Sequence, residues 1–310
     1  MKLEYNILWI DNDLPGYIER GEVTDIEDFL TENGFEPNIE KVFDEADLDQ
    51  FIDKHKYDLI ISDFKLENTT GGKIIEKIRN EKKLDTEILF YTAQIENSHE
   101  FNNEVRDLAF IERLTIQLGR DRLMDKIEKV ITLTLKKLLE LNATRGLITA
   151  ATSDLDVEIE DLVMILVYDK LKLNDEEING IINFYVEDFL KKSPDHFLKK
   201  YNEHGFKNWF HRIEASRKWK IFRELLKKID NDEIRNFLKS NKSYQTQVID
   251  IRNIFAHAKE IINEQGIPAL KGQLGKDDEE FTEASCVVIR KNLIEHKRNI
   301  ETLKNMLNNG

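Results

Sequence analysis

The stretch ILWIDND, residues 7–13, joins a short apolar run to a cluster of acidic and amide side chains. Its first four residues are of the type that fills a buried strand, and the run is too short for a helix of ordinary length. Polar residues directly after such a run predict a loop at the carboxyl end of the strand. The fold of the first third of the chain follows from this pattern of a strand that leads into an acidic loop.

The same succession of strand and helix recurs through the first 130 residues. We expect strands at 5–10, 38–43, 59–63, 87–92 and 109–112, with helices up to residue 33 and at 45–55 and 72–79. Apolar strands that alternate with helices predict right-handed crossovers around a five-stranded parallel sheet. We therefore assign residues 1–130 to an α/β domain.

Polar side chains follow the expected strands at the edge where parallel sheets place their working sites. Asp11 and Asp13 follow the first strand, Asp63 ends the third, Thr92 ends the fourth and Arg113 ends the fifth. Carboxylates from two strand ends suit a hard cation such as Mg²⁺, and one of them could accept a phosphoryl group. A nearby hydroxyl and a cationic side chain could then sense the new charge.

Three segments of this domain resemble those of a response regulator receiver domain. ILWIDND is similar to its acidic first loop, LIISDFKLENTTGGKIIEKIR to its phosphoacceptor segment and ILFYTA to its switch threonine segment. The resemblance implies that Asp63 is the phosphoacceptor and that Asp11, Asp13 and Asp63 are the metal-site acids, with Mg²⁺ as the cofactor. It also implies that Thr92 and Arg113 form the switch and that a histidine kinase is a partner.

The sequence departs from the receiver pattern at two places. Asn12 stands where the family usually has its second acid, although Asp13 is next to it, and Arg113 with Leu114 replaces the usual lysine–proline pair. A planar guanidinium does not substitute directly for a compact ammonium. Two alternatives therefore stay open: a phosphorylated switch, or an inherited acidic pocket whose output face binds a partner without chemistry.

The rest of the chain shows a predominantly helical pattern. We expect helices at 123–141, 158–172, 175–192, 206–228, 231–239, 244–263 and 282–306, with residues 264–278 as a non-helical connection. We assign residues 131–142 to a connecting helix and residues 143–310 to an all-α bundle. Trp209 and Trp219 lie among basic residues and could stack on unpaired bases, but we favour a core position for both.

The segment DIRNIFAHA, residues 250–258, places Arg252, Asn253 and His257 in an otherwise apolar helical pattern. On an ideal helix Arg252 and His257 diverge by roughly 140°. Either the helix is irregular there or a second copy of the chain completes the site. Arg290 and His296 have a similar spacing by chance, and we expect this pair to lie on an exposed, charged helix face.

RNIFAHA resembles the signature of the HEPN superfamily of all-α RNases and RNase-like domains, and the helical order over roughly residues 140–310 is similar as well. The resemblance implies a metal-independent endoribonuclease that acts on RNA as a homodimer, in bacterial stress or anti-phage responses. His257 is then the general base or acid, Arg252 stabilises phosphoryl charge and Asn253 orients the histidine or binds phosphate. Asp154, and Asp156 after it, could line the cleft.

A non-catalytic interpretation of the same residues stays open. His257 can be an interface histidine, and Arg252 can form a salt bridge to Asp250 or Asp154. The chain is then a signalling module in which a receiver-like domain and a helical dimerisation domain both bind proteins. We keep this as the alternative to a regulated RNase.

The composition sets the outer limits of these interpretations. The formal net charge of −14 argues against broad nucleic-acid binding, yet residues 1–50 carry fifteen acidic and three basic residues, whereas residues 201–250 carry seven and eleven. The single cysteine, Cys286, excludes an intramolecular disulfide. No apolar run reaches the length of a membrane helix, so we expect a cytoplasmic protein without membrane contact.

Overall fold

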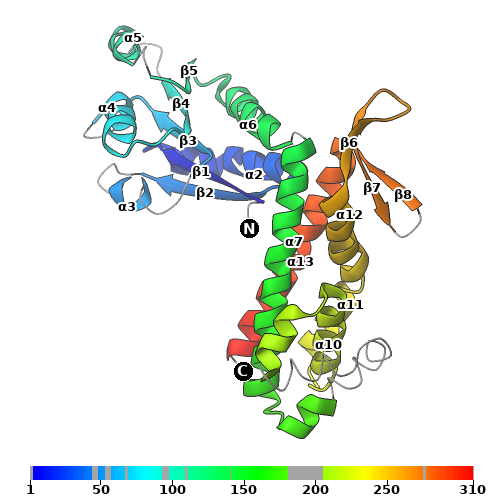
Figure 1. The fold of residues 1–310 in the computed structure, drawn as a ribbon. Helices are drawn as coiled ribbons and strands as arrows, with labels where there is room; N and C mark the ends of the chain where they lie inside the picture. Colours follow the sequence, from blue (N-terminus) through cyan, green and yellow to red (C-terminus); the bar gives the residue numbers. More distant parts are fainter. Residues whose placement is uncertain are drawn as a thin grey trace. The chain divides into compact units, whose positions relative to one another are not determined.

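The computed structural model describes residues 3–43, 48–52, 57–66, 69–92, 98–108, 111–139, 141–180, 205–274 and 277–309 (Figure 1). The chain divides into two compact units, residues 2–144 and residues 145–310. No helix within the described ranges is both long enough and apolar enough to cross a membrane.

The amino-terminal unit is built on a five-stranded parallel sheet with the strand order β2-β1-β3-β4-β5. Its strands are β1 (Glu4–Ile10), β2 (Glu36–Val42), β3 (Leu59–Asp63), β4 (Glu87–Thr92) and β5 (Leu114–Leu118). Its helices are α1 (Leu14–Glu19), α2 (Glu22–Glu32), α3 (Leu48–Ile52), α4 (Gly71–Glu76), the π-helical turn η2 (Lys77–Glu81), α5 (Ser98–Asp107) and α6 (Leu123–Leu139). The expected α/β sheet is confirmed, and four of its five strands lie where the sequence predicts them.

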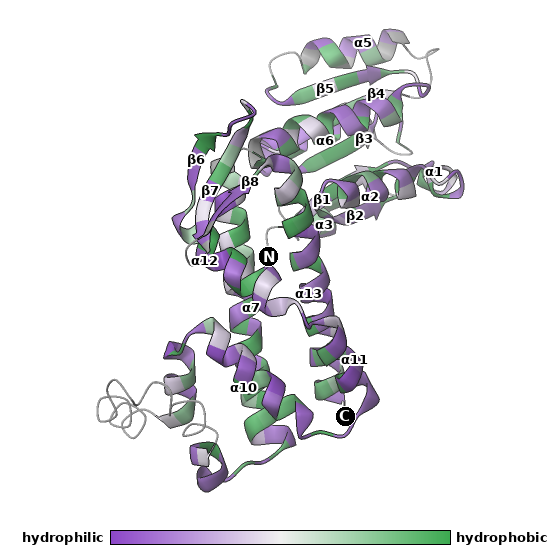
Figure 2. Cartoon of the chain, turned by 90° about the vertical axis from the view of Figure 1, so that its right-hand side faces the viewer, coloured by the Kyte–Doolittle hydropathy of each residue, from purple (hydrophilic) through white to green (hydrophobic). Residues whose placement is uncertain are grey.

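Both faces of the sheet are buried, because successive strand residues point to opposite sides. Tyr5, Ile7 and Trp9 of β1 pack with α1, α2 and α6, whereas Leu8 and Ile10 pack with α3, α4 and α5. β3 is coloured as hydrophobic over most of its length in Figure 2. This double burial explains why the strands are short, nearly continuous apolar runs.

The fifth strand differs from the expectation. Residues 109 and 110 lie outside the described residues, and the strand begins only at Leu114, after Arg113 with a φ of 56°. Leu114 pairs with Ile88 and Leu118 pairs with Thr92. The apolar run before Arg113 suggested a strand, but the alternating residues after it form the ladder.

The helix α6 belongs to the core of this unit. Leu123, Ile127, Val130, Ile131 and Leu135 are buried in the same cluster as β1 and β3. The connecting helix expected at residues 131–142 therefore starts with residues that pack into the amino-terminal core. Residue 140, between α6 and the next helix, lies outside the described residues.

The carboxy-terminal unit combines helices with a small sheet. Its helices are α7 (Leu141–Met164), the π-helical turn η4 (Ile165–Lys170), α10 (Ala215–Lys227), α11 (Asp232–Ser240), the π-helical turn η5 (Gln245–Asp250), α12 (Ile251–His257) and α13 (Glu283–Asn309). Residues 175–180 and 205–212 are also helical, and the remainder of the helix expected at 175–192 lies outside the described residues. The long helices α7 and α13 run beside each other, and Lys304 Nζ lies 2.7 Å from Glu158 Oε2 (Figure 1).

The expectation of an all-α second half is wrong for one segment. Residues that were assigned to the end of a helix and to a loop form an antiparallel sheet of β6 (Lys259–Ile262), β7 (Pro268–Leu274) and β8 (Asp277–Phe281). The helix expected at 244–263 ends at His257, because Ala258 adopts an extended conformation. Cys286 lies in α13, within the helix expected at 282–306.

The aromatic residues of the basic segment form part of the core, as predicted. Trp209, Trp219 and Phe222 are buried, and the Trp219 ring stacks on the Tyr244 ring with centroids 4.1 Å apart. These rings hold α10 against η5. They are not exposed for stacking on nucleic-acid bases.

Candidate functional site

Three of the side chains predicted for the acidic pocket meet at the carboxyl edge of the parallel sheet. Ile10 pairs with Ser62 across β1 and β3, so Asp11 and Asp63 leave the sheet at the same edge, and Thr92 ends the neighbouring strand β4. Asp11, Asp63 and Thr92 are all buried. The sequence therefore located this edge correctly.

The carboxylate of Asp11 is occupied by hydrogen-bond donors from the protein. The Tyr91 hydroxyl donates to Oδ2, and the Asp13 backbone N–H donates to Oδ1 at 2.6 Å. Trp9 Nε1 donates in turn to the Tyr91 hydroxyl at 3.3 Å. Burial raises the pKa of Asp11, and the hydrogen bond from Tyr91 opposes that rise.

The side chain of Asp13 pairs with a cation that the sequence did not single out. Arg120 Nη2 lies 3.1 Å from Asp13 Oδ2, and the Arg120 guanidinium lies 4.3 Å from the centroid of the buried Tyr17 ring. Arg120 follows β5 by two residues. It was missed because the fifth strand was expected five residues too early.

Arg113, predicted as the cation of the switch, lies at the other edge of the sheet. It precedes β5, and its Nη1 donates to the Asp85 carbonyl at 2.9 Å, just before β4 begins. The amino ends of parallel strands meet at the edge opposite their carboxyl ends. The assignment of Arg113 to the switch is therefore wrong.

Gly71 lets α4 begin directly against the end of β3. A Cβ atom at this position would lie 2.2 Å from the Asp63 carbonyl oxygen and 2.7 Å from Phe90 Cε2. Only glycine fits this close approach. Gly71 thus allows α4 to start in contact with the backbone that carries Asp63.

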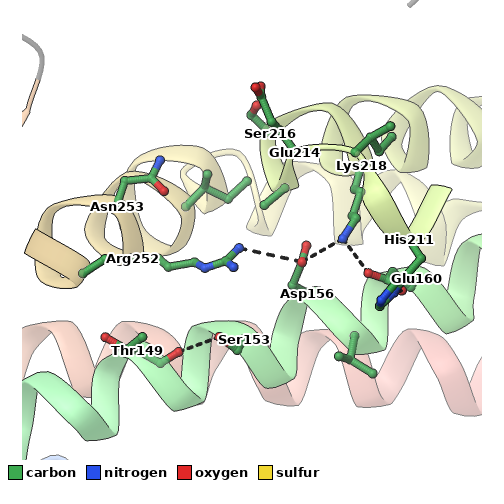
Figure 3. A pocket seen from close by; sticks show the side chains of 15 residues that line it. Thr149, Ser153, Asp156, Glu160, His211, Glu214, Ser216, Lys218, Arg252 and Asn253 are labelled. Carbon is green, nitrogen blue, oxygen red and sulfur yellow. Dashed lines mark hydrogen bonds and ion pairs between the residues drawn. The ribbon is translucent and has the colours of Figure 1, made fainter. Parts of the chain in front are cut away.

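A second candidate site is a cavity of about 840 Å³ within the carboxy-terminal unit, between α7, α10 and α12. Figure 3 shows side chains from these helices converging on it. Arg252 and Asn253 come from α12, Asp156 and Glu160 from α7, and Lys218 from α10. His211 lies at its end next to Glu160.

A chain of ion pairs crosses this cavity. Arg252 Nη1 lies 3.7 Å from Asp156 Oδ2, and Lys218 Nζ lies 2.9 Å from the same oxygen and 2.5 Å from Glu160 Oε1. His211 Nδ1 lies 2.7 Å from Glu160 Oε2. The Lys218 side chain is only 5% exposed, so the two carboxylates neutralise a cation that is largely removed from water.

The predicted residues of α12 divide between the cavity and the surface. Arg252 and Asn253 line the cavity, whereas His257 is exposed on the last turn and does not line it. The partner of Arg252 is Asp156, not Asp250 or Asp154, and Asp154 does not line the cavity. The π-helical turn η5 ends before Arg252, so no irregularity separates Arg252 from His257.

Two contacts hold α12 in place. A Cβ atom at Gly272 of β7 would lie 2.3 Å from Ile254 Cγ2, so the small sheet packs directly on this helix. Arg145 Nη1 donates to the Ala258 carbonyl at 2.8 Å, immediately after His257. The candidate residues are thus carried by a short helix that is fixed from β7 and α7.

The competing arginine–histidine pair is buried, contrary to the expectation of an exposed face. Arg290 and His296 are 0% and 2% exposed. His296 Nδ1 lies 2.7 Å from Asn241 Oδ1, and its Nε2 lies 2.9 Å from Gln247 Oε1. Burial lowers the pKa of His296 to about 4. This pair is a structural element of the core.

One family model matches most of the amino-terminal unit. Residues 21–128 match the family described as response regulator receiver domain. The chain is similar to the chemotaxis protein CheY4 of Vibrio cholerae, with 20% identity and a TM-score of 0.33 over 43% of this chain and 99% of that chain. The amino-terminal unit therefore contains a response regulator receiver domain.

Two further solved structures are similar over the same part of the chain. One is a two-component response regulator from Clostridium difficile, with 21% identity and a TM-score of 0.32 over 44% of this chain and 98% of that one. The other is TrrA from Thermotoga maritima in complex with Mg²⁺ and BeF, with 19% identity and a TM-score of 0.30 over 41% and 98%. Comparison with curated proteins gives no match.

A receiver domain implies Mg²⁺ at the acidic pocket, but the residues here do not fit that ion as they are placed. Asp11 accepts hydrogen bonds from Tyr91 and from the Asp13 backbone, and the Asp13 carboxylate faces Arg120. No three histidine, cysteine, aspartate or glutamate residues in the described parts of the chain are grouped so that they could hold a metal ion. Mg²⁺ prefers an octahedral set of oxygen ligands at about 2 Å.

Proposed function

We propose that this chain is a signalling protein in which the receiver unit controls a metal-independent endoribonuclease of the HEPN type in the carboxy-terminal unit. Arg252 and Asn253 open into a polar cavity, while His257 is exposed on the same short helix. This arrangement is the observation that carries the proposal. The substrate is RNA, and the working form is a homodimer.

The reaction needs a base, an acid and a stabiliser of negative charge. The ribose 2′-hydroxyl attacks the adjacent phosphorus, its proton passes to a base, and the 5′-oxygen leaves with a proton from an acid. His257 serves as one of these two groups, since an imidazole exchanges protons near neutral pH. Arg252 neutralises the phosphoryl oxygens and Asn253 orients the histidine or the phosphate. The products are a 2′,3′-cyclic phosphate and a 5′-hydroxyl.

The geometry of α12 favours a composite site formed by two copies. Arg252 and His257 diverge by roughly 140° on a regular helix, and α12 has no irregularity between them. One helix cannot aim both groups at one phosphate. A second copy that brings its own His257 to the Arg252 of the first copy resolves this divergence.

The contact between Arg252 and Asp156 is compatible with exchange for a phosphate. The two side chains are 3.7 Å apart, and the Arg252 side chain is 35% exposed. Ion pairs with this exposure contribute about 0–1 kcal/mol. A bidentate phosphate contact is stronger, so RNA can draw the guanidinium away from Asp156.

The experiment is RNA cleavage by the purified full-length protein with EDTA present. Wild type is expected to cut single-stranded RNA, and Arg252→Ala and His257→Ala are each expected to lose at least about 100-fold in rate. His211→Ala tests whether His211, which lines the cavity, contributes to the rate in addition to His257. Arg235→Ala removes one positive charge from the exposed face of α11 and is the control for Arg252→Ala. Equal rates for wild type and the Arg252→Ala/His257→Ala double variant contradict the proposal.

Control through the receiver unit is tested separately. We propose Asp63 as the carboxylate that a histidine kinase phosphorylates, with Thr92 sensing the change from the end of β4. Acetyl phosphate is expected to alter the dimerisation of wild type, measured by sedimentation, but not that of Asp63→Asn. No change in either protein contradicts a phosphorylation switch and leaves the RNase assay untouched.

A non-catalytic signalling module is the second candidate, and the charge of the cavity favours it. Asp156, Glu160 and Glu214 outnumber Arg252 and Lys218 among the lining residues, so the formal charge there is −1 with neutral histidine. A phosphodiester is better held where cations are in excess. A dimer that does not cut RNA, and whose assembly responds to the receiver unit, is the result that selects this candidate.

A further inference from the structure

The acidic pocket of the receiver unit already contains a positive charge that belongs to the protein. Arg120 leaves the carboxyl end of β5 and faces Asp13 across 3.1 Å. Its Nη2 atom is buried although the side chain as a whole is 35% exposed. The charged end of Arg120 therefore points inward, toward the edge where the acids gather.

The Tyr17 ring fixes the position of this guanidinium. The Arg120 guanidinium carbon lies 4.3 Å from the ring centroid, and that of Arg20 lies 4.9 Å from it. Tyr17 itself is only 1% exposed. Because the ring is rigid and buried, cation–π contact of about 0.5–2 kcal/mol holds Arg120 at one place beside the pocket.

The carboxylate of Asp11 is held by two hydrogen bonds from the protein, and the cation that acts on it is Arg20. Asp11 accepts the Tyr91 hydroxyl and the Asp13 N–H, and Tyr91 is held by Trp9. These donors use one lone pair on each oxygen of Asp11, so a metal ion there has to share both oxygens with them. Asp13, the other carboxylate of the acidic loop, already faces Arg120.

We infer that the resident cation of this receiver pocket is the Arg120 guanidinium and that the pocket holds its acidic loop without Mg²⁺. A divalent ion at Asp11 and Asp13 and a guanidinium 3.1 Å from Asp13 repel each other, which adds to the reluctance of Mg²⁺ to lose its water. The individual contacts of Arg120 are modest. They act together, because Asp13 and the Tyr17 ring both hold the guanidinium beside the acidic loop. The inference concerns only the receiver unit and does not depend on RNase activity; it requires that any phosphorylation of Asp63 proceed without bound Mg²⁺.

The test is a calorimetric titration of the full-length protein with MgCl₂ at constant ionic strength. Wild type is expected to show no saturable binding up to about 10 mM. Arg120→Gln removes the charge and is expected to gain one Mg²⁺ site at least tenfold tighter than wild type. Arg120→Lys keeps the charge and is expected to gain none. Arg122→Gln removes one exposed positive charge two residues away and is the matched control.

Three further experiments locate any Mg²⁺ site that Arg120→Gln gains and verify that the variants are folded. Adding Asp11→Asn to Arg120→Gln is expected to abolish the gain, and Mn²⁺ binding followed by electron paramagnetic resonance is expected to give the same order of affinities. Circular dichroism verifies that each variant is folded. Submillimolar Mg²⁺ binding by wild type that Asp11→Asn removes overturns the inference. So does a folded Arg120→Gln protein that binds Mg²⁺ no better than wild type.

Discussion

The buried imidazole of His296 makes the stability of the carboxy-terminal unit depend on pH in a defined window. Burial lowers its pKa from 6.5 to about 4. An unfolded chain takes up a proton at this residue below about pH 6.5, whereas the folded unit does so only near pH 4. The unfolded state then binds more protons, so the free energy of unfolding falls as the pH falls through this window.

The size of this effect follows from the two pKa values. A difference between 6.5 and about 4 corresponds to about 3 kcal/mol when it is fully expressed, below pH 4. Between pH 7.5 and pH 5.0 it corresponds to about 2 kcal/mol. The groups that face the ring are Asn241, Gln247 and the edge of Tyr244, and burial raises the Tyr244 pKa far above this range. None of the three becomes charged between pH 5.0 and pH 7.5.

Urea unfolding at these two pH values measures the effect. In a Trp9→Phe background the remaining tryptophans, Trp209 and Trp219, report on the carboxy-terminal unit alone. Wild-type His296 is expected to lose about 2 kcal/mol more than His296→Gln on going to pH 5.0. His257→Gln removes an exposed imidazole from the same unit and is expected to behave like wild type. Equal losses in wild type and His296→Gln refute the reasoning.

Four substitutions and one control test other parts of the fold. Gly272→Ala is expected to destabilise the carboxy-terminal unit by about 1–3 kcal/mol in the same urea assay, whereas Gly146→Ala, with no atom within 4 Å of the new Cβ, is expected to be neutral or stabilising. Asn231→Ala removes the two backbone hydrogen bonds at the start of α11 and is expected to cost about 1 kcal/mol. Lys218→Met leaves two carboxylates without their shared cation and is expected to cost about 3 kcal/mol. Gly71→Ala is expected to lower the melting temperature of the receiver unit, measured by calorimetry, because the new Cβ meets backbone.

The strands of the receiver unit could be predicted because both sheet faces are buried. β3 and β4 were predicted at the bounds that the structure gives, since an apolar run with polar ends has few alternatives when it is short. β5 is less apolar and alternates, and its residues are half-buried. The apolar run at residues 109–112 was therefore predicted as the fifth strand. As a result Arg120, the cation just after β5, was not identified.

The small sheet of the carboxy-terminal unit could not be predicted from local pattern. Lys259–Ile262 continues the apolar spacing of α12, and Asp277–Phe281 is almost entirely acidic. What makes these residues strands is their pairing with β7 and the contact of Gly272 with α12, which are tertiary facts. His296 was predicted on an exposed helix face for a related reason. The residues next to it in sequence are charged, and they do not indicate that its side of α13 is buried.

The hydrogen bond from Arg145 to the Ala258 carbonyl fixes the position of the candidate histidine relative to α7. Arg145 is the first residue of the carboxy-terminal unit in the chain, and its partner directly follows the candidate histidine. This hydrogen bond joins the start of α7 to the end of α12 across a separation of 113 residues in sequence. Movement of the start of α7 away from α12 has to stretch or break it.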